Sequence, residues 1–143
     1  MSLEWMREEN ARWNDDKKRI IGTAPAGVFD QRFKDLADDD SLPGDWWRVE
    51  KDGETVAYGW LDLVWGDAEI VLATDPGCRD QGIGSFTLEK IESECRTMGV
   101  NYVYNTVRPT HPDREKVTSW LEKRGFVASE DGALRLALAK AKA

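Results

Sequence analysis

The chain has 143 residues, of which 41% are hydrophobic and 33% charged, a balance typical of a soluble globular protein rather than a disordered one. This length accommodates one domain with its own core and is short for two. A formal net charge of −7 argues against a nucleic-acid partner held through phosphates, and no apolar run approaches the roughly 20 residues that span a bilayer. The charge suits a cationic or amine ligand, although many proteins are acidic for solubility alone.

The two cysteines, Cys78 and Cys95, form neither a disulfide framework nor a CxxC metal motif. The N-terminal stretch MSLEWMREEN is charged where a signal peptide would be apolar. We therefore expect a reducing, cytoplasmic location and no bound metal.

Residues 1–45 are polar and are expected to be helical in pieces, with no clear β-strand. Two apolar stripes at helical spacing carry this expectation: a weak one at Trp5, Met6, Ala11 and Trp13, and a better one at Val28, Phe29, Phe33 and Leu36. The loop GTAPAG separates them.

The runs WWRVEK (46–51), ETVAYGWLDLVW (54–65) and AEIVLAT (68–74) are aromatic and β-branched and predict three antiparallel strands. Asp52-Gly53 is a type I′ hairpin signal between the first two, and Gly66-Asp67 a plausible II′ turn between the second and third. This register places Trp47, Val49, Val56, Tyr58 and Trp60 on one face of the sheet. Core packing explains these aromatics best; a substrate groove walled by Trp46, Trp47 or Trp65 is the alternative.

A helix is predicted from about Ser85 to Met98, ended by Gly99, and a strand over 100–107 follows it. Thr110 and Asp113 resemble a capping box at the start of a second helix that ends at Gly125. A last strand covers 133–138. The order predicts an α/β fold with a mixed antiparallel and parallel twisted sheet flanked by helices. We expect a single domain over 1–143, with the sheet in 46–138 and a tail at 139–143.

The stretch RDQGIGSF (79–86) lies between an apolar strand and a helix. The first N–H groups of a helix have no intrahelical partner and attract anions, above all phosphate. Two bare glycines allow close approach, and an arginine adds positive charge. The cradle consists of Arg79, Asp80, Gln81, Gly82, Ile83, Gly84 and Ser85.

Three ligand-binding motifs and a plain tight turn are the possible interpretations of this cradle. A dinucleotide fingerprint fails because Thr87 occupies its third glycine position, and the P-loop motif is absent. The pyrophosphate loop of an acyl-CoA site and a plain tight turn with a helix cap both remain open.

The sequence RDQGIG (79–84) resembles the [RQ]xxGx[GA] signature of the GNAT superfamily of N-acetyltransferases. An apolar strand ending in Asp75-Pro76 precedes it, and EKRGF (122–126) resembles the family's closing EKxGF. The resemblance covers about 46–138. It implies that the pyrophosphate of acetyl-CoA lies on the 79–85 amides and that pantetheine pairs with the backbone of Leu72, Ala73 and Thr74.

Two carboxylates interrupt the apolar strands, Asp62 and Glu69. With a turn at Gly66-Asp67, Val64 pairs with Glu69 and Asp62 with Val71, so that the two acids are diagonal neighbours about 7–8 Å apart at Cα. Like charge and partial burial suit such a pair to general-base chemistry, and a Glu is often found on this strand in the family. Glu69 is therefore the preferred base. The alternative is that both are strand-end acids that face solvent or pair with Arg48 or another basic residue.

The general acid departs from the family pattern, because Leu121 stands where many members carry a tyrosine and Arg114 where they carry an asparagine. Tyr104, Ser119 or His111 could replace it, or water could serve. His111 is the only histidine and is included among the catalytic candidates.

The resemblance implies an N-acetyltransferase that moves an acetyl group from acetyl-CoA to a primary amine by direct attack in a ternary complex. A backbone N–H near Leu72 or Ala73 would contact the oxyanion. The alternative is a non-catalytic domain of the same fold that binds acyl-CoA as a sensor or interaction module. The acceptor is left open, as is a homodimer formed through a sheet edge.

Overall fold

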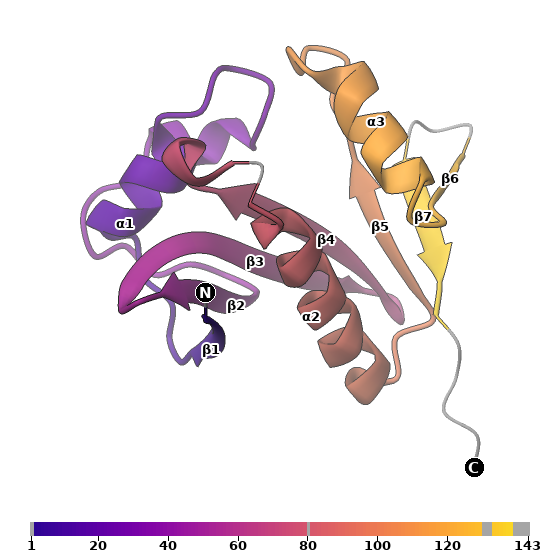
Figure 1. Ribbon diagram of the computed structural model, residues 1–143, viewed down its shortest axis with the longest axis horizontal. Helices are drawn as coiled ribbons and strands as arrows, with labels where there is room; N and C mark the ends of the chain where they lie inside the picture. The colour runs from indigo at the N-terminus through magenta and orange to yellow at the C-terminus, as the bar shows by residue number, and fades with distance from the viewer. Residues whose placement is uncertain (1, 80, 130–132, 139–143) are drawn as a thin grey trace.

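The computed structural model describes residues 2–79, 81–129 and 133–138 and contains a seven-stranded mixed sheet in the order β1-β2-β3-β4-β5-β7-β6 (Figure 1). The strands are β1 Leu3–Glu8, β2 Asp45–Lys51, β3 Glu54–Val64, β4 Asp67–Thr74, β5 Tyr102–Thr106, β6 Val127–Ala128 and β7 Ala133–Ala137. The helices are α1 Asp15–Lys17, η1 Lys18–Gly22, η2 Gln31–Lys34, η3 Pro76–Cys78, α2 Ile83–Met98 and α3 Arg114–Glu122.

The predicted fold class is confirmed: β4 and β5 pair in parallel and every other neighbouring pair of strands is antiparallel. The sheet is open. Asp80 and the predicted tail at 139–143 lie outside the described residues. No helix in the described part of the chain is both long and apolar enough to cross a membrane.

The expectation that residues 1–45 lack a strand is wrong, because Leu3–Glu8 forms β1 at the edge of the sheet, antiparallel to β2. Trp5 holds it in place, since its ring stacks on Trp47 with centroids 5.6 Å apart and planes 10° from parallel. Helical structure in this region is short, and the better of the two predicted stripes yields only the four-residue 3-10 helix η2.

The hairpin predicted at Asp52-Gly53 is confirmed, with φ of 51° and 84° at the two turn residues and Lys51 paired with Glu54. The next turn lies one residue earlier than predicted, at Trp65-Gly66, again with φ of 51° and 84°. The register therefore changes, and Asp62 lies directly opposite Glu69 rather than diagonal to it.

The predicted common face of Trp47 and Trp60 is also wrong. A register shift at Val49/Glu50 pairs Trp46 with Trp60, so that these two rings stack 4.4 Å apart on one face of the sheet. Trp47 points to the other face and packs with Leu61. A bulge of this kind adds one residue to a strand and reverses the facing of everything beyond it.

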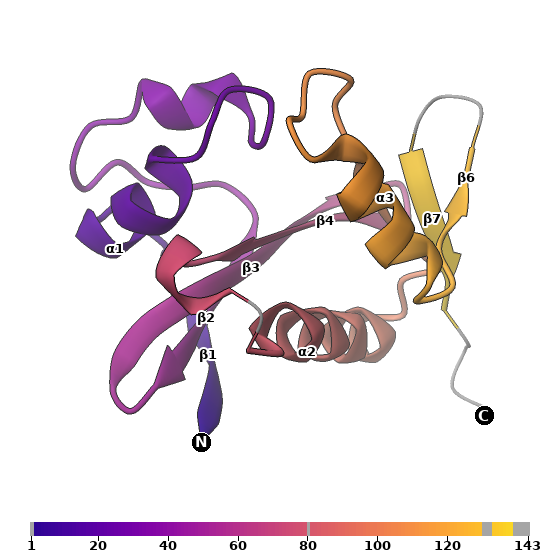
Figure 2. The same ribbon diagram turned by 45° about the horizontal axis from the view of Figure 1, so that its top comes forward.

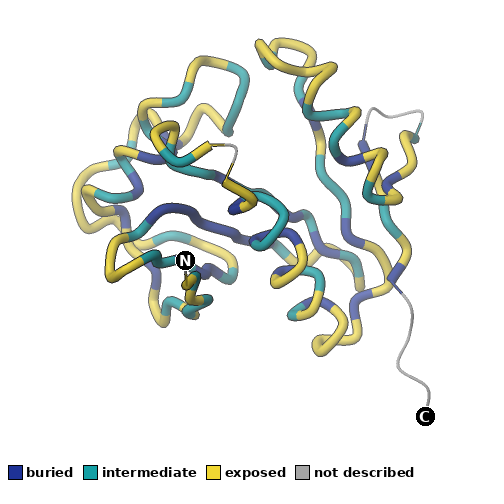
Figure 3. Tube along the Cα trace, viewed as in Figure 1, coloured by how far each residue is buried: buried dark blue, intermediate teal, exposed yellow. Residues whose placement is uncertain are grey.

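Helices cover both faces of the sheet (Figure 2). On one face, α2 and α3 pack apolar side chains onto the central strands, among them Leu88, Ile91 and Leu121. On the other, the N-terminal turns place Trp13, Ile20, Ile21 and Phe33 over Trp46, Tyr58 and Trp60. Most of the buried residues lie along the middle strands of the sheet (Figure 3).

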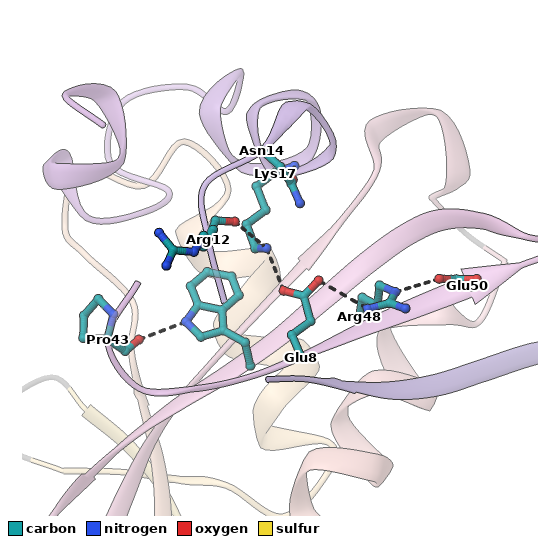
Figure 4. A network of polar contacts seen from close by, with 8 residues as sticks. Glu8, Arg12, Asn14, Lys17, Pro43, Arg48 and Glu50 are labelled. Atoms are coloured by element: carbon teal, nitrogen blue, oxygen red, sulfur yellow. Dashed lines mark hydrogen bonds and ion pairs between the residues drawn. The ribbon is translucent and has the colours of Figure 1, made fainter. Parts of the chain in front are cut away.

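A buried lysine attaches the N-terminal segment to the sheet (Figure 4). Lys17 is 1% exposed, and its Nζ donates to Glu8 Oε1 at 2.6 Å and to the Arg12 carbonyl at 2.9 Å. Glu8 also faces the Arg48 guanidinium at 3.6 Å, and Arg48 in turn pairs with Glu50 at 2.6 Å. The ammonium lies over the rings of Trp46 and Tyr58, which supply further attraction to a desolvated cation.

Helix α2 begins at Ile83, two residues before the predicted start at Ser85, and follows Gly82, whose φ is +77°. It ends at Gly99, whose φ is +78°, as predicted. Helix α3 begins differently: Asp113 is its N-cap but makes no side-chain cap, so the predicted capping box with Thr110 does not form. The Asp113 amide instead donates to Nδ1 of His111 at 2.9 Å.

Strands β4 and β5 part soon after they meet. Their parallel pairing includes only Ala68 with Val103 and Glu69 with Tyr104, and Figure 1 shows the two strands diverging beyond this point. The side-chain amide of Asn105 reaches across and donates to the Ile70 carbonyl at 2.8 Å. From Val71 to Thr74, the β5-facing edge of β4 therefore has no strand partner, although its residues are half-buried or buried.

Candidate active site

The N-terminus of α2 presents free backbone amides beside the parted strands. The first helical hydrogen bond runs from the Phe86 amide to the Gly82 carbonyl at 3.1 Å, which leaves the amides of Ile83, Gly84 and Ser85 without a helical acceptor. No side chain among the described residues caps this end. The site predicted to cradle an anion is thus open to one.

The two glycines of the cradle differ in their backbone conformation and in the space around them. Gly82 adopts positive φ in open space, whereas a Cβ on Gly84 would lie 3.6 Å from the Trp120 ring, an ordinary contact. The protein itself would therefore tolerate a methyl group at Gly84. Close approach of a ligand to the helix end explains a bare residue there better than packing does.

A second cation, Arg124, approaches the cradle from the turn that follows α3. The Arg124 guanidinium stacks over the Trp120 ring at 3.9 Å and donates to Ser85 Oγ at 2.6 Å and to the Trp120 carbonyl at 3.0 Å. Arg124 is the variable residue of the EKxGF-like ending, a position that carries no signal of its own. It fixes Trp120 against the start of α2.

Two cavities meet at the point where β4 leaves β5. One has a volume of 600 Å³ and contains most of the predicted cofactor residues; the other, of 530 Å³, contains the predicted catalytic ones. Their shared walls are Val28, Phe29, Leu72, Thr74, Gly84, His111, Val117 and Trp120.

The 600 Å³ cavity brings together Leu72, Ala73, Thr74, Arg79, Gly82, Ile83, Gly84 and Ser85. Gln81 does not line it; its side chain accepts a hydrogen bond from Lys51 Nζ at 3.1 Å. Asp80 is outside the described residues. Apart from these two, the structure places the predicted cofactor residues around one space.

Asp62 and Glu69 both line the 530 Å³ cavity, with Trp60 on the same face of the sheet. The alternative of a pair with Arg48 is wrong, because Arg48 binds Glu8 and Glu50. Within the described residues, neither Asp62 nor Glu69 has an ion-pair or hydrogen-bond partner. Two uncompensated carboxylates therefore face the cavity.

His111 lies at the junction of the two cavities. Desolvation lowers the pKa of its imidazole below the ordinary 6.5, with Arg108 adding to the effect and Asp113 opposing it. Because Nδ1 accepts from the Asp113 amide, the proton of the neutral ring resides on Nε2. His111 is therefore a hydrogen-bond donor near neutral pH rather than a base.

The other acid candidates are not at the junction. Ser119 is exposed and lines neither cavity, and Tyr104 lines a separate hollow of 330 Å³. Desolvation and the nearby Glu69 and Asp67 raise the pKa of Tyr104. Leu121 is 3% exposed and lines the 530 Å³ cavity with an apolar surface.

The tryptophans suggested as a groove wall are elsewhere. Trp46 and Trp47 are core residues at 1% exposure, and Trp65 is 98% exposed at the β3–β4 turn. The aromatic wall of the 530 Å³ cavity consists of Phe29, Phe33, Trp60 and Trp120. Phe29 and Phe33 belonged to an apolar stripe that gave no sign of facing a cavity. In the described residues, no group of three or more His, Cys, Asp or Glu side chains is arranged to hold a metal ion.

A mixed sheet that parts beside an uncapped helix N-terminus is the architecture implied by the resemblance, that of acyl-CoA-dependent acyltransferases. The model of the acetyltransferase (GNAT) family matches residues 3–126, and the chain belongs to this family.

Solved structures show the same fold. A protein from Desulfovibrio desulfuricans, described as an acetyltransferase of the GNAT family, superposes with a TM-score of 0.72 at 15% identity, covering 96% of this chain and 100% of its own. The ribosomal-protein-S18-alanine N-acetyltransferase from Escherichia coli gives 0.63 at 16% identity, covering 99% and 97%.

A phosphinothricin acetyltransferase from Sinorhizobium meliloti, solved in complex with acetyl-CoA, gives a TM-score of 0.56 at 14% identity, covering 67% of this chain and 62% of its own. No curated protein matches the chain in sequence.

Proposed function

We propose that this chain transfers an acetyl group from acetyl-CoA to a primary amine by direct attack within a ternary complex. The observation that carries the proposal is the meeting of two cavities at the parted strands, one leading to the free amides of α2 and the other to unpaired carboxylates. A donor in one cavity and an acceptor in the other can therefore meet at the lining residues that the two cavities share.

The donor would bind along the 600 Å³ cavity. Its pyrophosphate would lie on the amides of Ile83, Gly84 and Ser85, with Arg79 adding charge. Its pantetheine would extend along the edge of β4 that β5 leaves unpaired, where backbone groups offer strand-like hydrogen bonds. An N–H near Leu72 or Ala73 would then stabilise the oxyanion.

Glu69 is the proposed base, because it lines the acceptor cavity close to where β4 and β5 part. The amine nitrogen attacks the thioester carbonyl, a C–N bond forms, the C–S bond breaks, and the amine proton passes to Glu69 through water. We expect Glu69→Gln to lower kcat roughly 100-fold with a smaller effect on the KM for acetyl-CoA.

The leaving thiolate needs only a mild proton source, since a thiol ionises near pH 8.5. His111 at the junction can donate a hydrogen bond from Nε2–H to the sulfur while water supplies the proton. This role does not require the tyrosine that Leu121 replaces.

The test is release of free CoA thiol from acetyl-CoA across a panel of primary amines, with calorimetry of acetyl-CoA binding in parallel. Binding together with amine-dependent thiol release is expected. Failure to bind acetyl-CoA at millimolar concentration would rule out the proposed donor.

A second candidate function is a non-catalytic acyl-CoA-binding module. It is favoured by the absence of any tyrosine from the described lining of both cavities. Tight acetyl-CoA binding without thiol release from any amine in the panel would support this module and exclude the enzyme.

A further inference from the structure

We infer that the acceptor carries a second cationic group and that Asp62 binds it while the reacting amine attacks at the parted strands. This inference rests on the proposed function, since it concerns the acceptor half of the same site. It narrows the acceptor from any primary amine to a diamine or a similarly dicationic compound.

The first argument is the charge around the 530 Å³ cavity. Among the described residues, five charged side chains line it: Asp30, Arg32, Asp62, Glu69 and Arg108. Arg108 faces Asp30 at 3.9 Å, and Arg32 lies over the Phe33 ring at 5.0 Å. Both guanidiniums thus have neighbouring partners, whereas no cation in the described part of the chain pairs with Asp62 or Glu69.

The second argument is that the two carboxylates lie next to each other on one face of the sheet. Asp62 and Glu69 are direct cross-strand partners on the face that carries Trp60 and Val71. Their negative field reaches neighbouring groups, because Glu69 and Asp62 both contribute to the raised pKa of Tyr104. Arg135 on β7 faces the Tyr104 ring at 5.8 Å and partly offsets that field.

The third argument is the aromatic wall of the same cavity. Phe29 and Trp60 lie with their ring centroids 5.8 Å apart and line the cavity together with Asp62 and Glu69. Aromatic faces attract a desolvated cation and also accommodate the methylene chain that joins two amines. A neutral or anionic acceptor would gain nothing from the two carboxylates in this lining.

The spacing along β4 separates the place where the amine attacks the thioester from the place where the second cation binds. At about 3.3 Å per residue, Glu69 lies about 10 Å along β4 from Leu72, near which the thioester carbonyl is proposed. The reacting nitrogen must come within about 3–3.5 Å of that carbonyl carbon. A cation held at the acidic pair is therefore separated from the nitrogen by a chain of several atoms.

The two acids are not equivalent in this arrangement. Glu69 is on β4 itself, beside the parted strands, and Asp62 is on β3, one strand spacing of about 4.8 Å farther away. Glu69 is thus the better placed to take a proton, and Asp62 to hold the remote ammonium.

The experiment compares putrescine, a linear diamine, with butylamine, a monoamine of the same carbon chain. The readout is the ratio of their kcat/KM values in the thiol-release assay, because a general loss of activity cancels from it. We expect the wild type to favour putrescine roughly 10- to 100-fold, as suits one charge-assisted hydrogen bond, beyond the factor of two that two equivalent amines provide.

Asp62→Asn should bring this ratio close to that factor of two, and Asp62→Glu should retain part of the preference. Asp67→Asn is the matched control, because it removes the same charge from β4 outside the cavity and should retain the preference. Equal use of the two amines by the wild type would overturn the inference without any variant. Loss of the preference in Asp67→Asn as well would also overturn it, since a diffuse field would then explain the selectivity.

If neither amine releases thiol, the proposed function fails and the inference is tested by binding alone. Calorimetry of putrescine and butylamine on CoA-saturated protein then gives the answer. Tighter putrescine binding that depends on Asp62 would support the dicationic ligand, and equal affinities would overturn it.

Discussion

Nδ1 of His111 accepts a 2.9 Å hydrogen bond from the backbone N–H of Asp113, the residue that opens α3. This bond fixes the neutral tautomer with its proton on Nε2 and ties the only histidine of the chain to the first turn of a helix. It places a neutral donor, rather than a base, where the two cavities join.

The first prediction concerns the protonation of this histidine. Because folding lowers the pKa of His111, the folded chain binds that proton less tightly than the unfolded chain. Its contribution to stability is therefore complete above the unfolded value near 6.5 and is lost as the pH falls through the lower folded value. NMR titration of the imidazole should give a pKa below 6.5 and the Nε2–H tautomer.

Urea unfolding at about pH 8 and about pH 5 isolates this effect. The loss of stability between the two should be smaller in His111→Asn than in the wild type. An identical loss in both proteins, or a folded pKa above 6.5, would contradict the prediction.

The second prediction separates the two glycines of the cradle. Gly84→Ala should leave the free energy of unfolding unchanged or raise it by up to about 1 kcal/mol, because the added methyl meets only Trp120 at 3.6 Å. The same methyl should weaken acetyl-CoA binding, since it projects beside the free amides. Gly82→Ala should instead cost about 1 kcal/mol of stability, because its φ is +77°.

Thermal melts and calorimetry with acetyl-CoA measure both effects on the same samples. Unchanged acetyl-CoA affinity in a folded Gly84→Ala variant would show that the ligand does not approach this end of α2.

The third prediction concerns Arg124 as a positioning residue for the donor site. Arg124→Leu removes the hydrogen bond to Ser85 and the stacking on Trp120, so acetyl-CoA should bind several-fold more weakly while kcat changes less. In a double-mutant cycle with Ser85→Ala, the coupling in binding free energy should be about 1 kcal/mol. Lys123→Leu, next in the chain and exposed, is the control. Additive effects at Arg124 and Ser85 would mean that the bond does not matter for the donor.

The fourth prediction concerns the buried ion pair of the N-terminal segment. Lys17→Met should lower the free energy of unfolding by about 3 kcal/mol, because Glu8 would keep only the Arg48 guanidinium at 3.6 Å. Adding Glu8→Gln should recover part of that loss, since the uncompensated charge is then gone. Urea unfolding measures each step.

Lys18→Met is the matched control for this pair, because its ion pairs with Asp15 and Asp38 are solvent-exposed. Its unfolding midpoint should coincide with that of the wild type. If Lys17→Met behaved in the same way, the buried network could not be what holds this segment to the sheet.

Local signals predicted the parts of the fold that local chemistry determines. Asp52-Gly53 specified its turn because both residues tolerate positive φ, and Gly99 marked the end of α2. The next turn was displaced because Trp65 adopts a φ of 51°, which no preference of tryptophan indicates. That one-residue error changed the relation of Asp62 to Glu69 from diagonal to direct.

Long-range packing determines what could not be predicted. Strand β1 has no apolar alternation of its own and depends on pairing with β2 and on the stacking of Trp5 on Trp47. The bulge at Val49/Glu50 decides which tryptophan faces Trp60, and no residue type at that position predicts a bulge. In the site, the cradle followed from its glycines, but Arg124 and Phe29 emerged only when distant elements came together.

Because β4 and β5 pair over only a short length, the sheet consists of two parts, β1–β4 and β5–β7, that are joined along a short edge. Among the described residues, the two parts are connected by two residue pairs, by the Asn105 side chain, and by the Asn101 amide, which donates to the Gly66 carbonyl at 3.0 Å. The amides of β4 and β5 along that edge should exchange with deuterium sooner than the amides within either part of the sheet. If acetyl-CoA binds between β4 and β5 as proposed, it should hold the two parts of the sheet together, and its binding should slow amide exchange on both strands.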